Sequence, residues 1–121
     1  MFVQAIAYNQ PRTTIATIGA GASLSEAVTL PPGHVLCGIQ MPADWTAAAI
    51  TLQGSADNAT FQDVYVAAGT EHSITAAAAT TIALDPTLYR SFPYLKVRSG
   101  TGASAVNQAA ARSIALISRP L

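Results

Sequence analysis

Charged residues are scarce in this sequence, and their scarcity narrows the range of functions. They make up 10% of the 121 residues, and six basic side chains balance six acidic ones, whereas an average soluble domain is about 25% charged. Nucleic-acid-binding proteins gather basic side chains that neutralise phosphates. Here Lys96 is the only lysine and the arginines are scattered, so we expect no nucleic-acid partner. So little charge favours a surface covered by protein partners; the alternative is a stable domain with an uncharged polar surface.

Cysteine occurs once, at Cys37, so no disulfide can form within the chain. In the segment 34–41, HVLCGIQM, the side chains of Val35, Cys37, Ile39 and Met41 share one face of a predicted strand. This pattern predicts that Cys37 is a small, buried apolar residue. A catalytic thiol needs a nearby histidine or a helix N-terminus. His34 is close in sequence, but its offset of three residues places it on the opposite face of the strand.

Long apolar runs are absent from the sequence. No segment approaches the roughly 20 apolar residues that a membrane-spanning helix needs, so we expect no membrane partner. The first residues, MFVQAIAYNQPR, differ from a secretory signal because they lack a basic start and Gln4 interrupts the apolar stretch. We expect a protein that is made in the cytoplasm and is soluble, or is assembled into a larger structure there.

Constellations that would carry out a reaction are also missing. None of Ser23, Ser55 and Ser99 lies in a Gly-x-Ser-x-Gly turn between a strand and a helix. His34 and His72 are far apart in the sequence, and neither has the spacing of a metal-ligand motif. The six acidic residues include no adjacent pair. The sequence therefore predicts no enzyme, no catalytic residues, no metal site and no cofactor.

The most polar stretch lies between two apolar segments, in AAITLQGSADNATFQDVYV from Ala48 to Val66. Asp and Asn bond readily to nearby backbone and accept left-handed backbone angles, so GSADNA favours a tight turn between two strands. Two alternatives remain open for Ser55, Asp57, Asn58 and Asp63. Asp57, Asn58 and Asp63 could ligate calcium, which prefers six to eight oxygens, or the four residues could form a polar binding edge.

Two further features have more than one interpretation. The single tryptophan, Trp45, stands at the entrance of a predicted strand, where it either plugs one end of the core or stacks on a sugar. The segment 96–104, KVRSGTGAS, carries Lys96 and Arg98 beside a glycine-rich loop that lacks the spacing of a phosphate-binding loop. We expect this hairpin end to reach towards an acidic partner.

Short segments rich in Thr, Val and Ile, separated by Gly, Pro and Asn turns, indicate the fold. We expect strands within residues 12–19, 23–30, 35–41, 48–53, 60–69, 71–76, 80–86, 94–100 and 111–120. In the second of these, Leu24, Val28 and Leu30 share one face. Alanine favours helix at 76–80 and 106–116, but the surrounding Thr, Ile and Pro favour strands.

The prediction is an all-β protein: a single antiparallel β-sandwich or jelly roll of about eight strands over residues 12–121, preceded by an N-terminal arm over residues 1–11.

The order LSEAVTLPPGHVLCGIQMPADWTAAAITLQGSADNATFQDVY, then YLKVRSGT, then QAAARSIALISRPL resembles small structural proteins of tailed bacteriophages. The likeness covers most of the chain from Leu24 onwards. It implies a non-enzymatic virion protein that is made in the host cytoplasm and sits on the outer capsid surface. As a decoration or cement protein it would bind and stabilise the major capsid protein, often as a homotrimer. A tail, baseplate or head–tail junction protein is the first alternative.

Within that region, ITLQGSADNATFQDVY is also similar to the strand–turn–strand of galactose-binding-like (discoidin-type) jelly rolls. In that fold the ligand edge usually lies in other loops, so the turn residues do not imply a sugar site. A carbohydrate-binding module remains a second alternative, with glycan as its partner. It would be favoured by an exposed ledge of aromatic rings: Trp45, Tyr65, Tyr89, Phe92 and Tyr94.

We expect the two ends of the chain to form the partner interface. An extended apolar arm can add a strand to an exposed sheet edge, and many weak contacts on a lattice add up through multivalency. The expected interface residues are Phe2, Val3, Ile6, Tyr8, Arg12, Arg119 and Leu121.

Overall fold

The computed structural model describes residues 10–120, and within them the chain is almost entirely β-structure. The strands are β1 (Arg12–Ile18), β2 (Val28–Thr29), β3 (His34–Gln40), β4 (Ile50–Ser55), β5 (Gln62–Asp63), β6 (Ser73–Ile74), β7 (Thr81–Ala83), β8 (Tyr94–Ser99) and β9 (Arg112–Pro120), with a short 3-10 helix, η1 (Pro86–Tyr89). In these residues no helix is long and apolar enough to cross a membrane.

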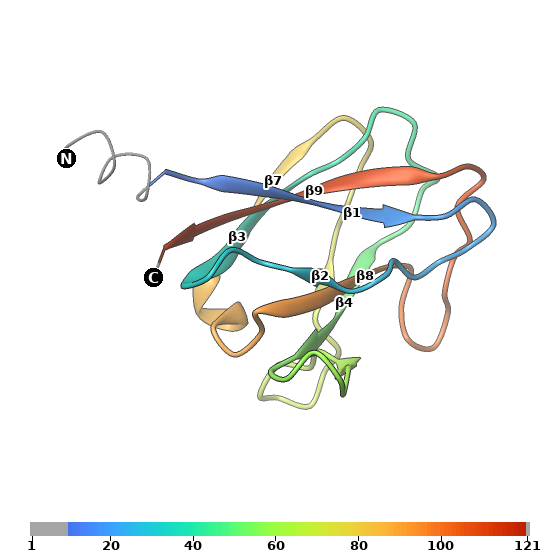
Figure 1. Ribbon diagram of the computed structural model, residues 1–121. Helices are drawn as coiled ribbons and strands as arrows, with labels where there is room; N and C mark the ends of the chain where they lie inside the picture. Colours follow the sequence, from blue (N-terminus) through green and yellow to red (C-terminus); the bar gives the residue numbers. More distant parts are fainter. Residues whose placement is uncertain (1–9, 121) are drawn as a thin grey trace.

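Two antiparallel sheets pack face to face (Figure 1). Sheet A has the order β1-β9-β3-β7, and sheet B has the order β2-β8-β4-β5, with β6 also pairing with β4. From β1 to β4 and from β7 to β9 the chain changes sheet at every step. This is the strand order of a jelly roll, so the predicted β-sandwich is confirmed.

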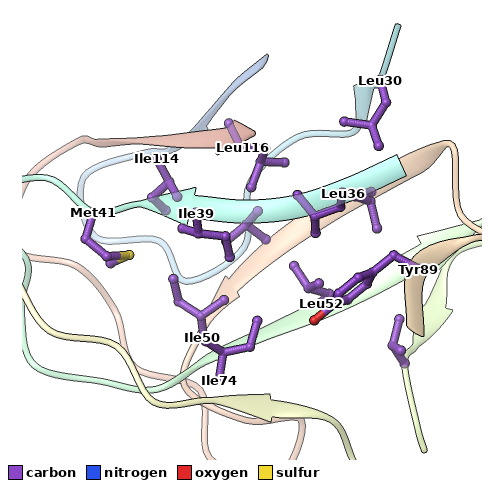
Figure 2. Packing of buried hydrophobic residues seen from close by; sticks show 14 of the residues in the cluster. Leu30, Leu36, Ile39, Met41, Ile50, Leu52, Ile74, Tyr89, Ile114 and Leu116 are labelled. Carbon is purple, nitrogen blue, oxygen red and sulfur yellow. The ribbon is translucent and has the colours of Figure 1, made fainter. Parts of the chain in front are cut away.

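The core lies between the sheets, because alternate residues of each strand point inwards. Figure 2 shows side chains of both layers meeting there, with Ile39 and Leu116 from sheet A above Ile50 and Leu52 from sheet B. Fully buried aliphatic residues on these strands are Ala16, Ile18, Leu36, Ile39, Ile50, Leu52, Leu95, Val97, Ile114 and Leu116. Burying each large aliphatic side chain contributes about 1.5–3 kcal/mol, and this burial holds the sheets together.

The helical alternative for residues 106–116 is wrong, because the residues from Arg112 onwards form strand β9. It is a central strand that pairs with both β1 and β3, and pairing on two sides outweighs the helical preference of its alanines. The run 76–80 is not helical either, and Ala79 has a left-handed φ of 57°. The preference for strand over helix was therefore correct for β9, and residues 76–80 lie in the loop between the two strands expected at 71–76 and 80–86.

The expected strand over 23–30 shrinks to β2. Ser25 is the reason, since its Oγ accepts a hydrogen bond from the backbone N of Val97 at 2.9 Å and donates to the carbonyl of Glu26. A side chain that bonds the backbone in this way competes with a regular ladder. Leu24 is 36% exposed, whereas Leu30 is buried, so the predicted apolar face is wrong at Leu24.

The prediction that Cys37 is buried in the core is wrong. The register between β3 and β9 shifts between Leu36 and Gly38, which leaves Cys37 as the extra residue of a β-bulge. The bulge turns Leu36, fully buried, into the core in place of Cys37. Cys37 is half-buried, and its Sγ donates to the carbonyl of Ile117 at 3.5 Å. Alternation read from sequence cannot detect an inserted residue.

Candidate functional site

The polar stretch that follows β4 is a closed turn. Ser55 Oγ accepts from the backbone N of Asp57 and of Asn58, at 3.2 and 3.0 Å. Asp57 Oδ1 accepts from the backbone N of Ala59 and of Thr60, both at 3.0 Å. These bonds, led by that from Thr60, lower the pKa of Asp57 to about 2. Asn58 takes a left-handed φ of 60°, so the turn interpretation is confirmed.

Asp63 does not join that turn, which removes the basis of the calcium alternative. Its Oδ1 accepts from Gln53 Nε2 at 3.1 Å and from Arg98 Nη1 at 2.8 Å. The hydrogen bond from Arg98 lowers the pKa of Asp63 below its usual range. Within residues 10–120, no group of three or more His, Cys, Asp or Glu side chains could hold a metal ion.

Arg98 is the centre of a buried polar cluster on the outer side of sheet B. The residue is only 7% exposed. Its Nε donates to Thr51 Oγ1 at 3.0 Å, its Nη1 to Asp63 Oδ1 at 2.8 Å and its Nη2 to Glu71 Oε2 at 2.6 Å. The expectation that Arg98 reaches an acidic partner is therefore wrong, because both carboxylates belong to the same chain. Lys96 is also engaged: its Nζ lies 4.7 Å from the centre of the Phe61 ring.

The loop after β8 closes over this cluster. The carboxylate of Glu71 accepts from the backbone N of Gly102 at 3.0 and 3.2 Å. A Cβ at Gly102 would lie 2.6 Å from Asp63 Oδ2 and 3.1 Å from Glu71 Oε2, so only glycine fits without displacing the carboxylates. The loop after β8 and the segment from β5 to Glu71 thus cover this part of sheet B.

A second buried cluster ties loops together around Gln108, which is 1% exposed. Its Nε2 donates to the Thr46 carbonyl and to Ser99 Oγ, and its Oε1 accepts from the backbone N of Thr46 and from Arg112 Nε. Arg112 also pairs with Asp44 at 2.9 Å. Sequence reasoning missed this cluster because its members are up to 68 positions apart and match no local motif.

Each of the two histidines lies within hydrogen-bond distance of one hydroxyl group. His72 Nε2 lies 2.5 Å from the hydroxyl of Tyr89, and His34 Nδ1 lies 3.1 Å from Ser118 Oγ. Burial, with a smaller effect of Asp85, raises the pKa of Tyr89 to about 12. The hydroxyl partners of the two histidines, Tyr89 and Ser118, are therefore not among the three serines singled out from the sequence.

The three candidate serines have structural roles. Ser55 belongs to the turn after β4, and Ser99 Oγ accepts from Gln108. Ser23 lies at the backbone ladder, where its carbonyl accepts from the backbone N of Ser99 at 2.7 Å. No pocket opens on the part of the chain that the structure describes.

The five aromatic rings do not form one exposed ledge. Trp45 and Tyr89 are buried in the core, and the indole Nε1 donates to the Ala48 carbonyl at 3.1 Å. The core interpretation of Trp45 is therefore confirmed. Phe92 packs over Gly54, and Tyr94 is half-buried. Only Tyr65 among the five is well exposed, at 58%.

The outer side of sheet A differs from that of sheet B. Directly opposed residues lie on the same face of a sheet, and the register places Thr13, Ile117, Gly38 and Ala83 in one row. The next row joins Ile15, Ala115, Gln40 and Thr81.

Ile15 is 53% exposed. We call the side chains of these two rows together with Thr17 the sheet A face; none of them carries a charge. An uncharged strand surface with an exposed isoleucine is suited to contact with another protein.

Two of the predicted interface residues border this face. Arg12 begins β1 and is opposite Ser118, and Arg119 follows Ser118 on β9. The structure therefore places both residues, which are exposed, at the end of sheet A where β1 starts (Figure 1), but Arg12 shares the face of the buried Ser118 and Arg119 points to the opposite face. The other predicted interface residues, Phe2, Val3, Ile6, Tyr8 and Leu121, lie outside the described residues, as does most of the predicted arm.

Comparison with known proteins finds likeness among solved structures. No family model matches the chain, and no curated protein matches it. Among solved structures the chain is similar to the crystal structure of the Yersinia pseudotuberculosis-derived mitogen (YPM), with 9% sequence identity and a TM-score of 0.42 over 93% of this chain and 87% of that one. A likeness this weak carries no argument about function.

Proposed function

We propose that this chain is a non-enzymatic structural protein of a tailed-bacteriophage virion that binds and stabilises the capsid shell. The observation that carries the proposal is the sheet A face, an uncharged strand surface with Ile15 exposed at 53%. The sequence resemblance supplies the setting, and the major capsid protein is the proposed partner.

The distribution of charge supports a protein partner over a small ligand. Arg98 and Arg112 are buried and paired with acidic residues of the same chain, so neither is available to hold a phosphate or a carboxylate ligand. On the strands of sheet A, only Arg12 and Arg119 are both charged and exposed, and both are at the same end of the sheet. A face without charges in its centre avoids the desolvation that buried charges impose on an interface.

Cosedimentation tests the proposal. The purified chain is mixed with shells assembled from the major capsid protein encoded in the same genome, and the shells are then pelleted. We expect the chain to pellet with the shells in a fixed stoichiometry and to raise their melting temperature. A chain that stays in the supernatant at every concentration would overturn the capsid role, and pelleting with tails alone would support the tail alternative instead.

A matched pair of variants locates the contact. Ala83→Glu places a charge at an exposed position of the sheet A face, and Gln62→Glu places the same charge at an exposed position of β5 in sheet B. We expect Ala83→Glu to reduce binding at least tenfold and Gln62→Glu to leave it unchanged. Equal effects of the two variants would remove the sheet A face from the proposal.

A further inference from the structure

Strand β1 is the longest edge strand among the described residues. Within them, no strand other than β9 pairs with β1. The other edge strands, β2, β5 and β7, are two or three residues long, whereas β1 has seven. Its pairing with β9 runs from Arg12 to Ile18 without a bulge. A straight strand of this length leaves a row of backbone groups along the edge of sheet A.

The sequence of β1, RTTIATI, does little to protect this edge. Natural proteins protect edge strands with proline, lysine, a bulge or an inward-pointing charge. Strand β1 has no proline, no lysine and no bulge, and its one charge, on Arg12, is at the first residue. The residues after it are threonine, isoleucine and one alanine, and threonine and isoleucine favour strands. The edge is therefore suited to receive a further strand.

We propose that β1 of a second copy of this chain pairs with this edge, antiparallel to it and across a two-fold axis at Ile15. A two-fold contact uses the same surface on both copies. In this register Ile15 lies opposite its counterpart, Thr13 lies opposite Thr17 of the second copy, and every residue from Arg12 to Ile18 is paired. The two copies of sheet A then form one continuous sheet, stabilised by backbone hydrogen bonds between the two β1 strands.

The side chains on the outer side of β1 match this register. Thr13, Ile15 and Thr17 are all exposed, and their order is the same in both directions along the strand. Directly opposed residues of an antiparallel pair share a face, with Cβ atoms about 4.5–5.5 Å apart. The two Ile15 side chains, each 53% exposed in the single chain, would therefore cover each other between two pairs of threonines.

The charges of β1 are also compatible with a second copy. On the inner side, Arg12 lies opposite Ile18 of the second copy, so the two Arg12 side chains are at opposite ends of the paired strands. Six residues of strand separate them, which is about 20 Å. Like charges that face each other directly would destabilise the pair, and this register keeps them apart.

Other registers of the same pairing are less favourable. An axis at Thr14 or at Ala16 pairs only residues 12–16 or 14–18 and places Ile15 opposite a threonine. An axis midway between two residues places the outer face of one copy beside the core side of the other, because neighbouring residues of a strand point to opposite faces. The axis at Ile15 alone pairs the whole strand and keeps both outer faces on one side.

This inference concerns self-association and does not rest on the proposed capsid role. The two have separate readouts, because pairing between copies is measured without shells and cosedimentation is measured with them. If cosedimentation fails while pairing is found, only the capsid role is lost.

Directed cross-linking tests the pairing and its register. In full-length protein carrying Cys37→Ser, one preparation receives Thr13→Cys and a second, enlarged by a tag, receives Thr17→Cys. The two are mixed, diluted, concentrated again and treated with a short thiol-to-thiol cross-linker. We expect at least tenfold more product joining the two variants than product joining two chains of one variant. The register places residue 13 beside residue 17 of the second copy, but keeps the two copies of residue 13 about 13 Å apart.

Thr81→Cys is the matched control, because it is exposed on β7, at the opposite edge of sheet A. Mixed with Thr13→Cys, it should give at least tenfold less product than Thr17→Cys does. An equal yield with Thr81→Cys would overturn the inference. Thr13→Cys chains that join to one another as readily as to Thr17→Cys chains would overturn it as well.

A second readout uses charge in place of cross-linking. The unaltered chain should have the mass of two chains in light scattering. Ile15→Lys alone and Ile15→Asp alone should each have the mass of one chain, because like charges then face each other across the axis. Mixing the two variants should restore the mass of two chains, and circular dichroism should show an unchanged fold throughout.

The masses also separate the alternatives. A mass of one chain for the unaltered protein, as expected if another segment of the same chain covers the edge, would overturn the inference. A mass of three chains, which the sequence resemblance implies, would contradict it too. So would an Ile15→Lys protein that keeps the mass of two chains.

Discussion

The two outer faces of the sandwich use their polar and apolar residues in opposite ways. Sheet B carries the buried Arg98, two carboxylates that pair with it and a loop fastened over them by Gly102. Sheet A carries Thr, Ala, Gln and an exposed Ile, with exposed arginines only at one end. The scarce charges of this chain therefore mainly organise its own loops. The face without charges is the one that we propose contacts another protein.

The largest loss of stability is expected when Arg98, the centre of the buried cluster on sheet B, is removed. Arg98→Ala leaves Asp63 and Glu71 without their cation, and removing one partner of a buried ion pair costs about 3–5 kcal/mol. We expect a loss of that size in the free energy of unfolding, measured by urea denaturation. The control, Arg90→Ala, removes an exposed arginine and should change stability by less than about 0.5 kcal/mol. A loss in Arg98→Ala as small as that in Arg90→Ala would show that the cluster does not stabilise the fold.

A smaller loss of stability is expected from displacing the loop that covers the Arg98 cluster. Gly102→Ala puts a Cβ 2.6 Å from Asp63 Oδ2, and overpacking of this kind costs about 1–3 kcal/mol. Gly19→Ala is the matched control, because a Cβ there meets nothing within 4 Å and its φ is not left-handed. Thermal unfolding of both variants measures the difference. A Gly102→Ala protein as stable as Gly19→Ala would mean that the loop gives way freely.

Acid should weaken the fold through carboxylates whose pKa is lowered. Asp57, with a pKa of about 2, and Asp63 bind protons less readily in the folded chain than in the unfolded one. Their stabilising contribution is therefore full above the unfolded pKa of about 3.9 and is lost as the pH falls towards 2. We expect the melting temperature to drop between pH 5 and pH 2, and to drop less in Asp57→Asn. A melting temperature that stays constant over this interval would contradict the prediction.

The smallest effect on stability is expected on the sheet A face. Ile15→Lys changes an exposed side chain outside the core, so the free energy of unfolding should change by less than about 0.5 kcal/mol. Binding to capsid shells should nevertheless be reduced, because a lysine at this position brings a charge that must be desolvated in the proposed contact. Urea denaturation measures the first quantity, and cosedimentation with the shells measures the second. A variant that still binds the shells as the original chain does would separate Ile15 from the interface.

Local sequence patterns predicted what depends on neighbouring residues. Alternation predicted the strands around Ile50, Leu95 and Ile114, and the chemistry of Asp57 and Asn58 predicted the turn. Contacts between distant segments were not predictable in this way. The pairing of Arg98 with Glu71, the burial of Gln108 and the bulge at Cys37 depend on which strands become neighbours. That arrangement is decided by the packing of both sheets.

Hydrogen exchange compares the two faces most directly. The exchange of backbone amides is measured by mass spectrometry in full-length protein, once alone and once bound to capsid shells. We expect peptides covering residues 12–18 to gain protection on binding, while peptides covering 61–71 and 94–105 stay unchanged. Protection gained at 61–71 or 94–105 and not at 12–18 would contradict the proposed contact, as would a bound protein that shows no change in any peptide.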